Sequence, residues 1–295
     1  MSPSMFHAVS RRQFLALGGT IAVGAVAVSA CGGSGGSSGS DRFALVTRYP
    51  KTNLVPGSVR LPISLADVGG QLLTDDSANL PETLTARVID DSTGNVVIES
   101  VTAKKHSVGL PQPYWPFIVD VNEIGIYSLQ VEGGPEDGAK FQLLDPSTVS
   151  VPLVGDALPG FDTPTVENVQ GLDPICTFTT GTCPFHSVSL NDALQSGKPI
   201  AYLIGTPAYC KTGTCSPALE TLIAAQETYG DSIVFVHAEV YTDRTATTVA
   251  PAVKAYYMDF EPSLFVTDAN GVLTHRLDAI FDADEVNDVL SSVTN

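Results

Sequence analysis

The sequence predicts two folded domains in series, an all-β sandwich followed by an α/β domain. The first observation is a run of short segments with alternating apolar residues, separated by turn residues, over 43–154. The second is a change of pattern over 155–295, where continuous apolar runs alternate with segments of helical spacing. The third is the length, because 295 residues are enough for two ordinary domains behind a targeting segment.

Residues 1–30 have the pattern of an export signal. The pair Arg11-Arg12 precedes a run of small apolar residues, which is typical of the twin-arginine export pathway. The segment ending at Cys31 resembles a lipobox, which implies cleavage before Cys31 and a lipid such as palmitate on that cysteine. An uncleaved anchor and ordinary signal-peptidase cleavage are the alternatives. Residues 31–42, almost entirely Gly and Ser, would then tether a lipoprotein to the outer face of the cell membrane.

The charge balance is strongly acidic. The chain carries 15 Lys and Arg against 32 Asp and Glu, a formal net charge of -17. Nucleic-acid affinity depends on neutralising phosphates with basic side chains, so this balance argues against a nucleic-acid partner. It argues equally against electrostatic attachment to anionic lipid. We therefore expect a solvated acidic surface and a membrane attachment that depends on the lipid alone.

Four segments of the first domain alternate apolar and polar residues as half-buried strands do: Val59 to Leu65, Leu84 to Val88, Phe117 to Val121, and Tyr127 to Val131. Pro62 lies inside the first of them, which predicts an edge strand. The stretch 125–131 resembles the late strand of immunoglobulin-like domains, in which a tyrosine, here Tyr127, anchors a corner. This resemblance implies an immunoglobulin-like sandwich.

A long connection, Lys104 to Pro116, separates two of these predicted strands and contains Trp115. We expect a crossover stiffened by its prolines, with Trp115 packed on the sandwich. A loop that contacts the second domain or a partner is the alternative.

We expect the chemistry where a strand, a cysteine pair and a helix follow one another. Ile200–Ile204 is a short apolar run that suits a parallel strand buried on both faces. Cys210 and Cys215 come next. Ser216 then predicts the N-cap of a helix, with Pro217 at its first position.

The spacing of the pair restricts its geometry. Residues five apart in a helix are separated by roughly 7.5 Å along the axis, and a disulfide needs Cα atoms within about 7 Å. Cys210 must therefore precede the helix, with Gly213 permitting a tight loop. A thiolate beside a helix N-terminus is stabilised by the helix dipole, and Lys211 adds a positive charge. These arguments alone leave open which of the two cysteines is the nucleophile.

The helices and strands predicted over 155–295 follow the order α, β, α, β, α, β, β, α. This is the order of the thioredoxin fold. Tyr209-Cys210 resembles the approach to that family's first cysteine, and the segment around Pro262 resembles the one that bears its cis-proline. The chain is thus similar to the thioredoxin-like superfamily. Thioredoxins place two residues between their cysteines whereas this chain places four, and Ile204 stands where the family has a buried acid.

This resemblance implies thiol–disulfide exchange on exported proteins, without a resident cofactor. Cys210 would be the nucleophile, Cys215 the resolving thiol, and Pro262 would present its backbone to the bound segment. A permanent disulfide between Cys210 and Cys215 is the alternative.

Cys176 and Cys183 form a second pair, in a segment rich in Thr and Gly. We expect a structural disulfide, which would close a short loop worth roughly 2–3 kcal/mol. A metal site is the alternative, because Cys183 and His186 are spaced as a ligand pair can be. His237 lies in a buried strand, as a core residue or as a side chain that approaches the cysteine loop at the edge of the sheet.

Three other functions compete with thiol exchange. Sco-type copper chaperones bind Cu(I) through two cysteines and a histidine, which His237 or His275 would supply here. Peroxiredoxins of the Q type place their cysteines four residues apart, but Pro207 and Glu261 stand where those enzymes need a hydroxyl side chain and an arginine. The third is a surface binding module in which both cysteine pairs are inert disulfides.

Overall fold

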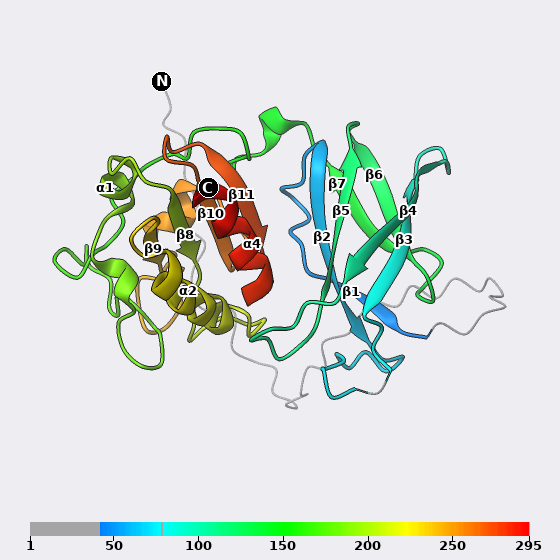
Figure 1. Cartoon of the computed structure of the whole chain (residues 1–295), viewed down its shortest axis with the longest axis horizontal. Coiled ribbons are helices and arrows are strands. Elements are labelled where there is room, and N and C mark those ends of the chain that lie inside the picture. The colour runs from blue at the N-terminus through cyan, green and yellow to red at the C-terminus, as the bar shows by residue number, and fades with distance from the viewer. Residues whose placement is uncertain (1–41, 78, 295) are drawn as a thin grey trace, which may run out of the picture. The chain divides into compact units, whose positions relative to one another are not determined.

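The computed structural model describes residues 42–77 and 79–294 (Figure 1). The predicted export signal, Cys31 and nearly all of the predicted tether lie outside these residues. The strands of the described part form three sheets. No helix in that part is long and apolar enough to cross a membrane.

Two antiparallel sheets make up the N-terminal part. One has the order β1-β2-β5 and the other β4-β3-β6-β7, with strands at Ala44–Thr47 (β1), Gly57–Ala66 (β2), Thr83–Asp90 (β3), Val96–Lys104 (β4), Trp115–Val121 (β5), Gly125–Val131 (β6) and Ala139–Leu143 (β7). The inward side chains of both sheets share one core, in which Leu61, Trp115 and Leu129 are fully buried. The alternation in the sequence therefore marks the strands, and the immunoglobulin-like assignment stays a prediction.

The prediction that Pro62 marks an edge strand is wrong. β2 is the central strand of its sheet, and Pro62 lies opposite Pro116 of β5. The Pro62 carbonyl accepts a hydrogen bond from the Arg48 N–H. The nitrogen of Pro62, which has no hydrogen to donate, therefore faces the β1 side of the strand, at Arg48. Strand β1 has already ended there, at Thr47. The proline removes no bond of the ladder between β2 and β5.

The C-terminal part is built on one sheet of order β11-β10-β8-β9, in which only the β8–β9 pair is parallel. This is the strand arrangement of the thioredoxin fold, as the element order predicted. Its elements are α1 (Leu190–Leu194), β8 (Ile200–Ile204), α2 (Cys215–Tyr229), β9 (Val234–Ala238), α3 (Pro251–Ala255), β10 (Ser263–Thr267), β11 (Leu273–Asp278) and α4 (Ala283–Thr294). Two short 3-10 helices precede them, at Pro146–Thr148 and Pro184–His186.

Helices cover both faces of this sheet, which explains the continuous apolar run of β8. Ala201 and Leu203 pack in the core that contains α2 and α4. Ile200, Tyr202 and Ile204 pack in the core that contains α1 and α3. All five are fully buried, as expected of a strand enclosed on both faces.

Two of the four α-helices in the described residues begin at a capping side chain. Ser189 caps α1, since its hydroxyl accepts the Asp192 N–H. Asp282 caps α4, accepting the Glu285 N–H at 3.0 Å. The other two lack a capping side chain: α2 begins at Cys215 with Thr214 at the N-cap, two residues before the predicted cap Ser216, and Ala250 is the N-cap of α3.

The connection that leads to Trp115 does both things that were expected as alternatives: it packs Trp115 on the sandwich and it contacts the second domain. Trp115 is fully buried in the sandwich core. Its neighbour Tyr114 donates a hydrogen bond to the Glu285 carboxylate at 2.6 Å, and the His106 ring lies 2.9 Å from the Asp282 carboxylate. Arg60 of β2 binds both carboxylate oxygens of Glu285, at 2.5 and 2.6 Å. A polar cluster thus ties the sandwich to the start of α4.

We predict that Arg60→Met lowers the free energy of unfolding by about 3 kcal/mol, because it leaves the Glu285 carboxylate largely buried without its cation. The double variant Arg60→Met/Glu285→Leu should recover much of that loss, since neither charge then remains. Chemical denaturation measures both. Arg87→Met, at an exposed position on β3, is the matched control and should change stability by less than about 0.5 kcal/mol. A loss in the double variant as large as in the single one would contradict the prediction.

Candidate functional site

The Cys210–Cys215 loop connects the end of β8 to the start of α2. The Cys210 N–H bonds to the Thr206 carbonyl at 3.1 Å, and Gly213 turns the chain with φ +71°. Cys210 thus precedes the helix and Cys215 is its first residue, as the disulfide geometry required. Cys210 is partly exposed, whereas Cys215 is 1% exposed. The outer thiol is accessible to another molecule and the inner one is not.

The surroundings of Cys210 stabilise its thiolate. Its sulfur lies 3.2 Å from the Thr212 hydroxyl, which can donate to it. The hydrogen bond from Cys215, followed by those from Thr212 and from the backbone N–H groups of Cys215 and Thr214, lowers the pKa of Cys210 to about 4. A thiolate that is present at neutral pH and accessible is suited to nucleophilic attack.

Cys215 lies against a partly buried carboxyl group that the sequence alone did not assign to the site. Its thiol is 3.4 Å from Oε2 of Glu261, and the same oxygen accepts the Thr206 N–H at 2.8 Å. Burial raises the pKa of Glu261 to about 7. The hydrogen bond to the Cys210 thiolate, together with burial, raises the pKa of Cys215. Glu261 is therefore placed to accept the proton that Cys215 must lose before it can react.

Pro262 follows Glu261 through a cis peptide bond and lies beside the buried cysteine. A Cβ atom built on Gly205 would lie 3.3 Å from the Pro262 Cβ and 3.6 Å from the Cys215 sulfur. Pro262 and Cys215 thus both border the space that a side chain at position 205 would occupy, and glycine leaves that space open. The structure thus brings together Cys210, Cys215 and Pro262, the three residues expected from the resemblance.

The second cysteine pair lies in a different and deeper cluster, with two histidines. His237 Nδ1 is 3.5 Å from the Cys183 sulfur, 3.9 Å from the Cys176 sulfur and 3.1 Å from Nε2 of His186. One ligand atom from each of the four residues lies within 4.8 Å of every other. All four side chains are buried, between 0% and 7% exposed.

The four cysteines among the described residues are free thiols. The disulfide expected between Cys176 and Cys183 is therefore not formed in this structure. Their sulfur atoms instead face the ring nitrogens of His186 and His237. This grouping was the alternative left open by the spacing of Cys183 and His186.

Thr177 links the two clusters. Its hydroxyl accepts the Ala208 N–H at 3.1 Å, in the turn that leads to Cys210, and lies 3.3 Å from the Thr206 hydroxyl. Thr177 also donates its N–H and its hydroxyl to Glu239. Burial raises the pKa of Glu239. The segment that follows Cys176 thus supports the backbone of the Cys210–Cys215 loop.

His237 belongs to the second cluster and not to the first. Its Nδ1 faces the Cys176–Cys183 pair, and its Nε2–H donates to the Gly205 carbonyl at 2.9 Å. Both ring nitrogens are thus engaged away from the sulfur of Cys210. The third possible ligand beside Cys210 and Cys215 is Glu261, a hard carboxylate that does not complete a Cu(I) site of the Sco type.

An open groove of about 370 Å³ adjoins the Cys210–Cys215 loop. It is lined by aromatic and charged side chains, among them Tyr49, Tyr209, Lys211, Tyr241 and Glu261. Tyr209 and Tyr241 meet edge to face, with ring centroids 6.1 Å apart. The groove offers apolar rings and backbone next to the accessible thiol.

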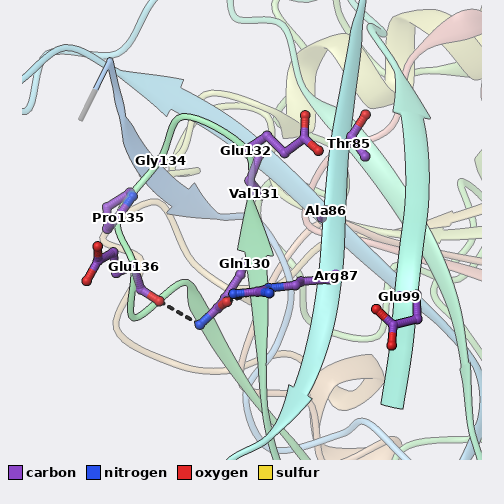
Figure 2. A pocket seen from close by; sticks show the side chains of 10 residues that line it. All are labelled: Thr85, Ala86, Arg87, Glu99, Gln130, Val131, Glu132, Gly134, Pro135 and Glu136. Atoms are coloured by element: carbon purple, nitrogen blue, oxygen red, sulfur yellow. Dashed lines mark hydrogen bonds between the residues drawn. The ribbon is translucent and has the colours of Figure 1, made fainter. Parts of the chain in front are cut away.

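A larger hollow lies elsewhere and lacks groups for redox chemistry. It measures about 660 Å³ and is lined by residues of β3, β4 and β6 and of the turn after β6, including Arg87 and three glutamates (Figure 2). A hydrogen bond of 2.6 Å from Gln130 to the Glu136 carbonyl spans part of it. None of its lining residues is a cysteine or a histidine. We therefore place the candidate site at the Cys210–Cys215 loop.

Comparison with known proteins gives structural neighbours alone. No protein-family model and no curated protein sequence matches the chain. Among solved structures, the chain is similar to a thiol:disulfide interchange protein of the thioredoxin family from Chlorobium tepidum TLS, with 15% identity, a TM-score of 0.35 and coverage of 49% of this chain and 100% of that one. It is also similar to a candidate thiol-disulfide oxidoreductase C-terminal domain from Bacteroides thetaiotaomicron, with 10% identity, a TM-score of 0.32 and coverage of 48% and 96%. Such distant likenesses assign no function to this chain.

We predict that iodoacetamide alkylates Cys210 selectively and at a rate that changes little above about pH 5, because its thiolate is already formed there. The rate should fall as the pH drops through about 4. Mass spectrometry of peptides from the reduced native protein identifies the labelled cysteine. Cys210→Ser is the control and should abolish the fast labelling. A rate that rises tenfold per pH unit up to pH 8 would contradict the prediction.

Proposed function

We propose that this protein is a thiol–disulfide oxidoreductase that acts on exported proteins. The observation that carries the proposal is the contrast between two neighbouring thiols, Cys210 accessible with a lowered pKa and Cys215 buried with a raised one. A nucleophile and a resolving thiol need these opposite properties. A permanently inert pair would need neither the accessible thiolate nor the adjacent Glu261.

The reaction proceeds in two exchanges. The Cys210 thiolate attacks one sulfur of a substrate disulfide, the substrate S–S bond breaks, and the first substrate sulfur leaves as a thiolate that takes a proton from water. Cys215 then gives its proton to Glu261 and attacks the Cys210 sulfur. The second substrate thiolate leaves, and the protein retains a Cys210–Cys215 disulfide. The substrate has gained two electrons and the protein has lost two. The same steps in reverse oxidise a substrate dithiol.

Pro262 and the adjoining groove suit a polypeptide substrate. Pro262 lies against Cys215, and the groove beside the loop presents Tyr209 and Tyr241. An extended segment lying there would place its cysteine near Cys210 and its apolar side chains on the rings. We propose exported proteins with disulfides as the partners of this groove.

The proposed location is the extracytoplasmic face of the cell membrane. It rests on the export pattern of residues 1–30 and on lipid attachment at Cys31. In this arrangement the sandwich over 43–154 is the membrane-proximal domain and the redox domain over 155–295 is the distal one. Disulfide exchange suits that compartment, because disulfides persist there.

We predict that Cys210→Ser abolishes reduction of a peptide disulfide, because no accessible thiolate remains. Cys215→Ser should instead accumulate a mixed disulfide between Cys210 and the peptide, since nothing resolves it. Stopped reactions analysed by intact mass measure both products. Exchange by Cys210→Ser at the wild-type rate would overturn the assignment, as would the absence of the mixed disulfide in Cys215→Ser.

We predict that Glu261→Gln slows the resolving step by about a hundredfold near neutral pH, because Cys215 loses its proton acceptor. In the wild type this step should accelerate as the pH rises through about 7, where Glu261 becomes ionised, and the variant should lack that inflection. Rapid-quench measurement of mixed-disulfide decay gives the rate. Glu227→Gln on the surface of α2 is the control and should match the wild type. An unchanged pH profile in Glu261→Gln would show that Glu261 is not the base.

A further inference from the structure

The donor atoms around His237 are spaced as the ligands of a tetrahedral metal ion are. Zinc bonds of about 2.0–2.1 Å to nitrogen and 2.3 Å to sulfur, at tetrahedral angles, separate two nitrogens by about 3.3 Å and a nitrogen from a sulfur by about 3.6 Å. The nitrogens of His186 and His237 are 3.1 Å apart. The Cys183 and Cys176 sulfurs lie 3.5 and 3.9 Å from His237 Nδ1. The three distances from His237 Nδ1 therefore lie within about 0.3 Å of the tetrahedral values, and all four donor atoms lie within 4.8 Å of one another.

We propose that these four side chains form a structural zinc site, with ligands Cys176, Cys183, His186 and His237. Two cysteines and two histidines are a common ligand set of closed structural zinc sites. Two thiolates and two neutral imidazoles around Zn²⁺ give no net charge, which suits a cluster whose members are all less than 10% exposed. The site is separate from the proposed redox function and does not depend on it.

Contacts around the ligands orient them toward the ion. The Nε2–H of His237 donates to the Gly205 carbonyl, so Nδ1 carries the free lone pair that a metal needs. The Cys183 N–H points at the Cys176 sulfur at 3.5 Å, which stabilises a thiolate there. The Phe185 ring stacks on Phe235 with centroids 5.2 Å apart, and both rings pack in the same core as Cys176 and Cys183. Such outer contacts fix the direction of metal ligands in general.

The ion would fix the segment 176–186, which contains three of the ligands, to strand β9, which supplies His237. Thr177 of this segment supports the turn before Cys210, because its hydroxyl accepts the Ala208 N–H. Strand β9 also binds the Gly205 carbonyl, through His237. The zinc site would thereby stabilise the backbone beneath the Cys210–Cys215 loop without contacting a substrate.

The first test measures the metal content of the full chain, produced in medium that contains zinc and copper and purified without chelator. Elemental mass spectrometry should find about one zinc per chain. Cys176→Ser and His237→Asn should reduce it at least tenfold. The matched control is Cys210→Ser/Cys215→Ser, which removes the other cysteine pair and should retain the zinc. Copper in place of zinc, or loss of zinc in the control, would overturn the assignment.

The second test uses the unaltered chain and so does not depend on a variant that folds. Removing zinc under reducing conditions and adding Co²⁺ should give the intense visible bands and the sulfur-to-cobalt charge-transfer absorption of a tetrahedral thiolate site. Equimolar Zn²⁺ should abolish these bands. Weak octahedral absorption would overturn the proposal. So would a Cys176–Cys183 disulfide, found by mass after alkylation of the protein as isolated, together with an absence of bound metal.

Discussion

The backbone of Gly205 is the constraint on which both cysteine clusters depend. Its N–H donates to the Ala238 carbonyl and extends the pairing of β8 with β9 past the strand end. Its carbonyl accepts the Nε2–H of His237, which turns Nδ1 toward Cys176 and Cys183. Its missing side chain leaves the space in which Pro262 and Cys215 meet. Gly205 therefore adjoins both clusters, one through its backbone carbonyl and the other through the space beside its Cα atom.

The hydrogen bond between the two thiols of the proposed redox site, together with the deeper burial of Cys215, gives them opposite pKa shifts. The Cys210 thiolate collects hydrogen bonds at the protein surface, whereas Cys215 lies behind it beside a carboxyl group whose own pKa is raised by burial. One negative charge on Cys210 disfavours a second one on Cys215 or on Glu261. Once Cys210 enters a mixed disulfide that charge is gone, and the proton of Cys215 is more easily lost. The first step of the exchange therefore prepares the second.

The acid that the sequence analysis found missing from β8 is supplied by another segment. Ile204 is fully buried among apolar side chains on the α1 and α3 face of the sheet. Glu261 reaches the buried cysteine from the residue before Pro262 instead. Its place next to Pro262 is a usable signal, since the residue before a proline that faces the cysteines must itself lie near them. Its ionisation could not be read from the sequence, because it depends on how much water the fold excludes.

Local sequence determined the order of the elements, the position of Cys210 before α2 and the turn at Gly213, because chain connectivity and helix capping act over a few residues. It also located the sandwich strands, whose alternation reflects one buried face. Tertiary structure alone decided that Pro62 is tolerated in a central strand, since this depends on where β1 ends. It likewise decided that His237 joins Cys176 and Cys183, from which it is separated by more than 50 residues. A lone histidine in an apolar strand has the same local pattern whether it packs in a core or binds a metal, and only the packing of distant segments distinguishes the two.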